Sequence, residues 1–275
     1  MAEFIAIHQT DASLLGCVLR RLAGKVSLGP LEQAAGVGFF QSDDVLLRKR
    51  PLSGQGALPE RLAEGVESEA VLITSGAVRA VRGAFQEETT LPFRFKRWLF
   101  TVGGNPLLLE PARPALNLGL PEYLRRALRG ESAAESLFLT FLGKLRDVGK
   151  LDDFNVDAEV SARALASAVG AAERAFEQLT LPLPALSVLV TNGRVMAALR
   201  RGHPLWLGLV DGITSCQRCE IARGSSNLDP RVNAHRVLRA ALILSGAQEA
   251  PPEGFREVHE GEILAVARGP QVVSL

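Results

Sequence analysis

The chain has 275 residues, of which 47% are hydrophobic and 22% are charged, with 31 basic against 30 acidic side chains. This is the composition of an ordinary globular protein that is long enough to bury a substantial core. The balanced charge excludes electrostatically driven binding of nucleic acid, because proteins of that class carry a concentrated basic excess. The apolar runs are short and interrupted, so none reaches the roughly 20 residues that a membrane-spanning helix needs.

The N-terminal residues and the cysteines point to one cellular compartment. No basic segment followed by a long apolar one opens the chain, so a secretory leader is not predicted. The three cysteines, Cys17, Cys216 and Cys219, are too few and odd in number for a disulfide framework. We therefore expect a soluble protein of the reducing cytoplasm.

Strand signals come first in the chain and return in its last third. Single strands are expected at residues 2–8, 70–74, 93–102, 205–210, 238–244, 263–267 and 271–274, the last two forming a pair.

Two hairpins are predicted. In the first, the apolar run 35–41 leads through a short acidic turn into 45–47. In the second, the runs 186–190 and 194–199 flank the Asn-Gly pair at 192–193, which supplies the positive φ angles that a type I′ turn requires.

Helices are predicted mainly in the middle of the chain. Apolar side chains recur at helical spacing over 131–148 and 157–179, and again over 14–20. Shorter helices are expected to begin at Pro59 and Pro121, because proline is favoured at the first helical position. Strands, then a helical pair, then strands again predict an α+β fold with two mostly antiparallel sheets and helices packed on them. Without an internal repeat or a Ser/Gly-rich linker, we expect a single domain over 1–275.

Common catalytic motifs are missing from the sequence. There is no Walker loop, no nucleophile elbow and no His-Glu-x-x-His, and Gly36-Val37-Gly38 lacks the third glycine of a dinucleotide-binding turn. Cys216 and Cys219 form a Cys-x-x-Cys pair, but a structural zinc needs four ligands. Only tertiary proximity would bring His203 or His235 to them. We interpret the pair as ordinary cysteines and predict no metal and no cofactor.

Six segments, in order, carry a resemblance. They are Gly36-Val37-Gly38-Phe39-Phe40, Ala77-Val78-Arg79, Thr90-Leu91-Pro92-Phe93, Phe100-Thr101-Val102-Gly103-Gly104, Ser132-Ala133-Ala134-Glu135 and Phe255–Glu262. Together with an apolar strand directly after Met1, this series resembles the class II glutamine amidotransferases of the short stand-alone type. The resemblance spans nearly the whole chain.

This resemblance implies the N-terminal-nucleophile hydrolase fold, a four-layer αββα sandwich of two mostly antiparallel sheets. In active members of the family, the residue after the initiator methionine is a cysteine whose own α-amine acts as the base. Its thiolate attacks the side-chain amide of glutamine and releases ammonia. That chemistry needs a thiol that deprotonates readily, a base beside it and an oxyanion hole.

The residues that the resemblance assigns to these roles are largely replaced. Ala2 stands at the nucleophile position, Gly103 replaces the asparagine of the oxyanion hole beside Gly104, and Ala133 replaces the aspartate that binds the substrate ammonium. Arg79 is either a remaining clamp for the glutamine carboxylate or an ordinary solvated arginine at a strand end.

We therefore predict a catalytically degenerate relative of these enzymes, with no catalytic residue. A vestigial pocket is expected at Ala2, Arg79, Gly103, Gly104 and Ala133. It would serve a binding or scaffolding module whose partner is another protein or a small ligand. The alternative is an active amidohydrolase or amidotransferase with a non-standard or processed nucleophile such as Cys17.

Overall fold

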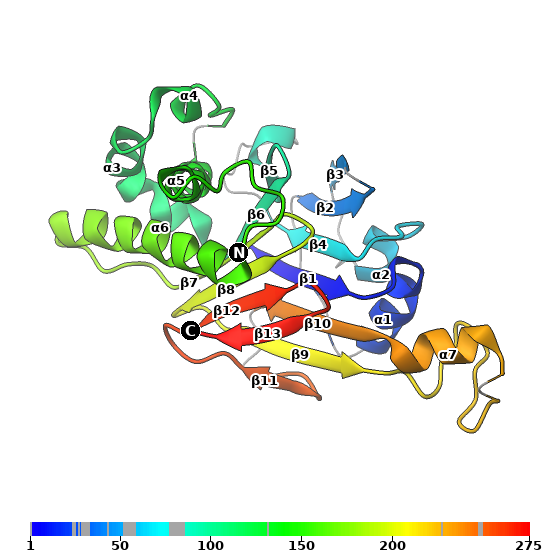
Figure 1. The fold of residues 1–275 in the computed structure, drawn as a ribbon. Coiled ribbons are helices and arrows are strands. Elements are labelled where there is room, and N and C mark those ends of the chain that lie inside the picture. Colours follow the sequence, from blue (N-terminus) through cyan, green and yellow to red (C-terminus); the bar gives the residue numbers. More distant parts are fainter. Residues whose placement is uncertain are drawn as a thin grey trace.

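A computed structural model describes residues 2–23, 26, 28, 34–42, 44–51, 59–76, 86–130, 132–226, 228–246 and 250–275. Two sheets lie against each other, with helices on both outer sides (Figure 1). All the strand pairs within these two sheets are antiparallel in the described part of the chain. No helix among the described residues is long and apolar enough to cross a membrane.

The larger sheet has seven strands in the order β11-β9-β10-β1-β4-β2-β3. Its strands are β1 (Glu3–Gln9), β2 (Ala34–Gln41), β3 (Asp44–Pro51), β4 (Ala70–Ser75), β9 (Leu205–Asp211), β10 (Arg239–Ser245) and β11 (Phe255–Glu257). The smaller sheet has six strands in the order β13-β12-β8-β7-β6-β5. Its strands are β5 (Phe93–Phe95), β6 (Trp98–Gly104), β7 (Leu186–Thr191), β8 (Met196–Arg201), β12 (Ile263–Ala267) and β13 (Gln271–Ser274).

Two long helices and several short ones complete the described elements. The α-helices are α1 (Leu15–Leu22), α2 (Pro59–Leu62), α3 (Arg113–Leu118), α4 (Glu122–Arg125), α5 (Ala133–Asp147), α6 (Ala158–Gln178) and α7 (Pro230–Val237). The 3₁₀ helices are η1 (Ala12–Leu14), η2 (Glu87–Thr89) and η3 (Pro106–Ala112). The two long helices begin at side-chain caps, since Ser132 accepts from the Glu135 N–H and Asp157 from the Glu159 N–H.

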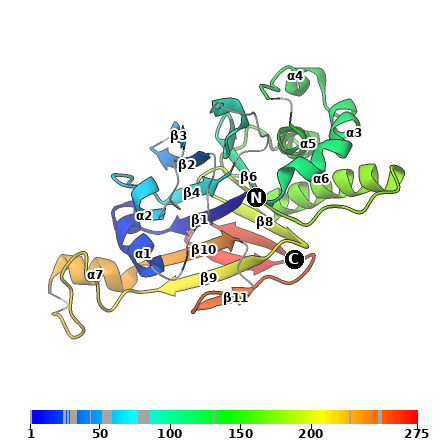
Figure 2. The ribbon, with the colours of Figure 1, turned by 180° about the vertical axis from the view of Figure 1, so that it is seen from behind.

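Three apolar clusters separate the layers. Helices α5 and α6 pack on the six-stranded sheet, and α1 and α2 cover the outer face of the seven-stranded sheet (Figure 2). The third cluster lies between the sheets. Strand β1 shows the alternation that this requires, because Phe4 and Ala6 face the other sheet while Ile5 and Ile7 face α1. The four-layer sandwich predicted from the sequence is confirmed.

The predicted elements are present with shifted ends, of which β3 differs most, at eight residues against the predicted run 45–47. Two turns were predicted wrongly. Residues 93–102 are not one strand but the hairpin β5–β6, which turns at Lys96 (φ 50°) and Arg97. The β7–β8 hairpin closes at the pair Thr191 and Met196, so its loop has four residues rather than the two of a type I′ turn. The Asn192 side chain holds this loop by accepting from the N–H groups of 194 and 195.

Helices α3 and α7, and the short strand β11, were not predicted. Helix α7 buries only Val232 and His235, which leaves too weak an apolar pattern to read from the sequence.

Candidate functional site

Three of the residues predicted to line a pocket lie where the start of β1 meets the end of β6. Ala2 and Gly104 form an antiparallel bridge there. The Ala2 N–H donates to the Gly104 carbonyl at 2.7 Å, and the Gly104 N–H donates to the Ala2 carbonyl at 2.9 Å. Ala2 is completely buried. Its methyl group cannot act as a nucleophile, and the Gly104 N–H is already used and so is not a free oxyanion donor.

Gly103 has no room for a side chain. A Cβ placed on it would lie 2.0 Å from the Ser245 Oγ and 2.5 Å from the Ser187 Oγ. These two hydroxyls are buried and hydrogen-bonded to each other at 2.6 Å, and they join β10 of one sheet to β7 of the other. The space beside Gly103 is therefore filled by an inter-sheet hydrogen bond instead of an asparagine amide. The nearby Asn105 is used elsewhere, because its side chain caps η3 at the Leu107 N–H.

Ala133 is buried in the first turn of α5, in the same apolar cluster as Ala2. Its N–H donates to Glu110 Oε1 at 2.8 Å, and Glu110 also pairs with Arg113. Two residues on, the Glu135 carboxylate accepts from the N–H groups of Arg129 and Gly130, both at 2.8 Å. The carboxylates around this helix start thus already have protein partners.

His203 is a neighbour of this site that the sequence did not assign to it. Its Cγ lies 3.5 Å from the point where a Gly104 Cβ would stand. Burial lowers the pKa of His203, and the charge of Arg200 acts in the same direction while Glu3 opposes it. The imidazole is therefore neutral at pH 7, and its Nε2 has no hydrogen-bond partner among the described residues. Nothing in the sequence links His203 to Gly104, because 99 positions separate them.

The structure thus brings together Ala2, Gly103 and Gly104, with Ala133 in the same apolar cluster as Ala2. Arg79, the predicted carboxylate clamp, and Ala77 lie outside the described residues.

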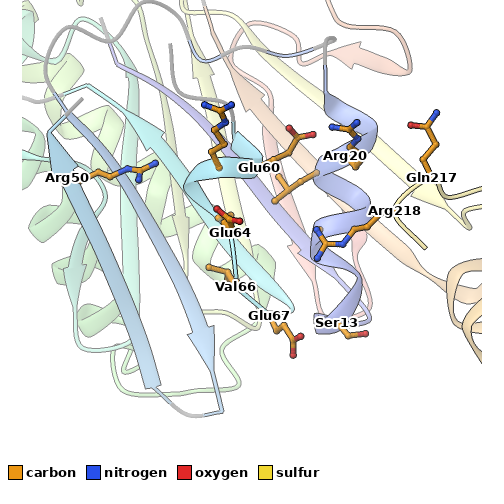
Figure 3. Close-up of a pocket in the computed structure, with 14 residues that line it drawn as sticks. Ser13, Arg20, Arg50, Glu60, Glu64, Val66, Glu67, Gln217 and Arg218 are labelled. Carbon is orange, nitrogen blue, oxygen red and sulfur yellow. The ribbon is translucent and has the colours of Figure 1, made fainter. Parts of the chain in front are cut away.

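A cavity of about 880 Å³ opens between α1 and α2, on the outer side of the seven-stranded sheet (Figure 3). Its walls carry both signs of charge: Arg20 comes from α1, Glu60 from α2 and Glu64 from the turn that follows. Arg218 reaches over to α1, where its Nη1 lies 2.5 Å from the point that a Cβ on Gly16 would occupy.

A second cavity, of about 930 Å³, is lined by residues of β3, β5 and α5, including Lys49, Arg129 and Glu135. The Lys49 ammonium donates to the Glu87 carbonyl at 2.9 Å. Burial lowers the pKa of Lys49 to about 8, although the charges of Glu87, Glu88 and Glu135 act against this. Both cavities offer a charged lining to a polar ligand.

The three cysteines lie together in the structure, which the sequence analysis did not predict. Cys17 of α1, Cys216 and Cys219 of the segment after β9, and His235 of α7 gather in one place, with their potential ligand atoms all within 4.8 Å of one another. The cysteines are free thiols, and the Sγ atoms of Cys17 and Cys219 are 3.5 Å apart. Burial, reinforced by the two neighbouring thiols, raises the pKa of the Cys17 thiol. This group of four side chains could hold a metal ion.

Layer order and strand order define the class of fold: a sandwich of two antiparallel sheets between helical layers, as in the N-terminal-nucleophile hydrolases. Comparison with solved structures makes this more specific. A glutamine aminotransferase class-II domain protein from Silicibacter pomeroyi superposes with a TM-score of 0.54 at 16% identity, over 99% of this chain and 98% of that one. A predicted glutamine amidotransferase from Pseudomonas aeruginosa superposes with a TM-score of 0.54 at 15% identity, over 99% of this chain and 96% of that one.

A larger enzyme shares the same fold in part. Glutamine phosphoribosylpyrophosphate amidotransferase from B. subtilis matches with a TM-score of 0.51 at 15% identity, over 99% of this chain but only 48% of its own. No protein-family model and no curated protein matches the sequence. At these identities the likeness establishes the fold, which is that of class II glutamine amidotransferase domains.

Proposed function

We propose that this chain is a catalytically degenerate class II glutamine amidotransferase-like protein that acts as a binding or scaffolding module. The observation that carries the proposal is the bridge between Ala2 and Gly104. The position that the family uses for its nucleophile holds the completely buried methyl group of Ala2. The neighbouring backbone donor, the Gly104 N–H, already donates to the Ala2 carbonyl.

Two further positions support the loss of chemistry. An asparagine cannot stand at Gly103 without displacing the Ser187–Ser245 pair. With alanine at 133, the ammonium group of a bound amino acid would lose water without gaining a carboxylate there, which is costly. The pocket therefore favours neither glutamine hydrolysis nor tight binding of free glutamine.

The alternative nucleophile, Cys17, is in an unfavourable place for that reaction. It lies within α1 rather than at the start of a strand. Processing that exposed its α-amine would remove β1, which lies between β10 and β4 inside the seven-stranded sheet. Without a bound metal ion, burial raises the pKa of the Cys17 thiol and so disfavours the thiolate, which is the attacking species.

The test is a glutamate-release assay on the purified chain with glutamine and γ-glutamyl compounds. We expect no release from the wild type and none from Ala2→Cys, with Ala2→Ser as the size-matched control, because a thiol alone restores neither the asparagine nor the aspartate. Release by the wild type that is lost in Cys17→Ala would establish the alternative. Activity in Ala2→Cys would mean that only the nucleophile has been lost.

The binding role needs its own measurement. Native mass spectrometry of untagged protein from its own host reports retained ligands and partner chains together. A defined second chain or small ligand on the wild type is expected. Calorimetric titration with glutamine should show no tight binding, and a tight complex would contradict the account of the pocket given above.

A further inference from the structure

We infer that Cys17, Cys216, Cys219 and His235 form a structural zinc site. The inference is independent of the proposed function, because these residues lie at the α1 and α7 side of the seven-stranded sheet and not at the Ala2–Gly104 bridge. Three thiolates and one imidazole form one of the ligand sets that structural zinc sites use.

The spacing of the ligand atoms fits the ion. Around a tetrahedral zinc with bonds of about 2.3 Å to sulfur, neighbouring sulfur atoms lie about 3.8 Å apart. The observed Cys17–Cys219 Sγ separation is 3.5 Å, and no pair of potential ligand atoms exceeds 4.8 Å. An ion therefore needs only small side-chain adjustments to bind all four groups.

His235 is oriented as a ligand. Its Nδ1 lies 2.7 Å from the Arg231 carbonyl oxygen, which can only accept, so Nδ1 carries the proton and donates it. This fixes the tautomer in which Nε2 has a free lone pair, as in metal-bound histidines whose other nitrogen is held by a backbone carbonyl. The Nε2 atom is buried and makes no hydrogen bond with any described residue. A metal ion would supply the partner that this buried nitrogen acceptor lacks.

The two cysteines of the Cys-x-x-Cys pair lie on a closed turn. Cys216 and Ile221 exchange both of their backbone hydrogen bonds, each at 2.9 Å, so the segment between them folds back on itself. Glu220 takes a left-handed φ of 58° to complete the turn. The turn presents Cys216 and Cys219 to Cys17, and two thiolates from one tight turn are a frequent half of a zinc site.

The surroundings suit a closed structural site rather than a catalytic one. Cys17, Cys216, Ile221 and Val232 belong to one buried apolar cluster, which limits access of water. All four coordination positions are supplied by protein, so none is open for a substrate. Three thiolates around Zn²⁺ leave one negative charge. The Arg218 guanidinium lies beside Gly16, the residue before Cys17 in the chain.

Zinc would connect three segments that are far apart in sequence. Cys17 and Cys219 are separated by 202 positions, and His235 belongs to α7, whose apolar contacts are few. On binding, the three thiols release their protons to solvent and the ion binds the thiolates. Because the four ligands come together only in the folded chain, zinc binding is also linked to folding.

The test begins with the metal content of the reduced, untagged wild-type chain, measured by elemental mass spectrometry. We expect one zinc ion per chain. Cys219→Ser and His235→Ala should lose it, whereas His259→Ala, a change at an exposed histidine outside the cluster, should keep it. A zinc-free wild type that also takes up no added zinc would overturn the site, as would bound iron or equal loss of zinc from His259→Ala.

A second measurement does not depend on the variants folding. Wild-type chain freed of metal and reconstituted with Co²⁺ should show the strong visible bands of tetrahedral cobalt and a sulfur-to-cobalt charge-transfer band. The weak spectrum of six-coordinate cobalt would contradict the inference. So would a Cys17–Cys219 disulfide, detected by mass spectrometry in the freshly isolated protein.

Discussion

Two regions beside β1 differ in the reactive side chains that they contain. At the start of the strand, where the family resemblance predicts a pocket, Ala2, Gly103 and Gly104 offer no reactive side chain. On the side where α1 and α7 lie (Figure 1), three cysteines and a histidine gather at a place that the family resemblance does not mark. A shared fold alone therefore does not establish chemistry, which depends on the side chains present at each place.

The largest expected effect is at the first region. Gly103→Ala should lower the free energy of unfolding by about 3 kcal/mol, because the added methyl group must displace two buried hydroxyls that connect the sheets. Urea denaturation followed by circular dichroism measures the change. Gly103→Ala combined with Ser245→Gly should recover part of the loss. If Gly103→Ala is as stable as the wild type, the site is not closed as described.

Acid should destabilise the protein through His8, a buried residue near the end of β1. Burial lowers its pKa to about 4 from 6.5, so between these values the unfolded chain binds a proton that the folded chain does not. Stability is therefore lost as the pH falls from 6.5 to about 4, by roughly 3 kcal/mol in total. His203 adds a loss of the same sign.

The measurement for His8 is the free energy of unfolding at a series of pH values. The curve of His8→Gln should be flatter than that of the wild type in this window, since the variant lacks the titrating group. Parallel curves would show that His8 does not account for the acid sensitivity.

Removing one hydroxyl of the inter-sheet pair should have a smaller effect. Ser187→Ala leaves the buried Ser245 hydroxyl without this partner, and we expect a loss of about 1–2 kcal/mol. The double variant Ser187→Ala/Ser245→Ala should cost less than the sum of the single changes, because both polar groups are then gone. Strict additivity in this double-mutant cycle would contradict the pairing.

The smallest effect is expected at the matched glycine of the second region. A Cβ on Gly16 would also meet a close atom, but that atom belongs to the end of the flexible Arg218 side chain. Gly16→Ala should therefore change stability by no more than about 1 kcal/mol, and helix propensity favours the alanine. The free energies of unfolding of Gly16→Ala and Gly103→Ala should be measured together, because the neighbour of Gly16 can move and those of Gly103 cannot. An equally large loss of stability in both variants would contradict this difference.

The architecture was predictable because local patterns agree with the layers. The apolar spacing over 131–148 and the cap at Ser132 specify α5, and the apolar runs specify the strands. The turn at Lys96 was missed because neither residue 96 nor 97 is glycine, proline, asparagine or aspartate. The length of the loop after Asn192 depends on side-chain hydrogen bonds that sequence pattern does not reveal.

The candidate sites were predictable to different degrees. The family resemblance assigned Ala2 and Gly104 to one pocket, and the structure joins these two residues in a β-bridge. The cysteine and histidine cluster was not predictable, because its members come from α1, a turn and α7, and only the tertiary structure brings these together. Cys216 and Cys219 alone gave half of a ligand set.

The edges of the two sheets restrict how this protein can associate. Strands β5 and β11 have three residues each and β13 has four, while the longer edge strand β3 carries Arg48, Lys49 and Arg50 and ends at Pro51. Short strands, clustered positive charge and proline all oppose the addition of a further strand from another chain. Any association with another chain is therefore expected to use side chains on the faces and in the cavities of the molecule rather than an added strand.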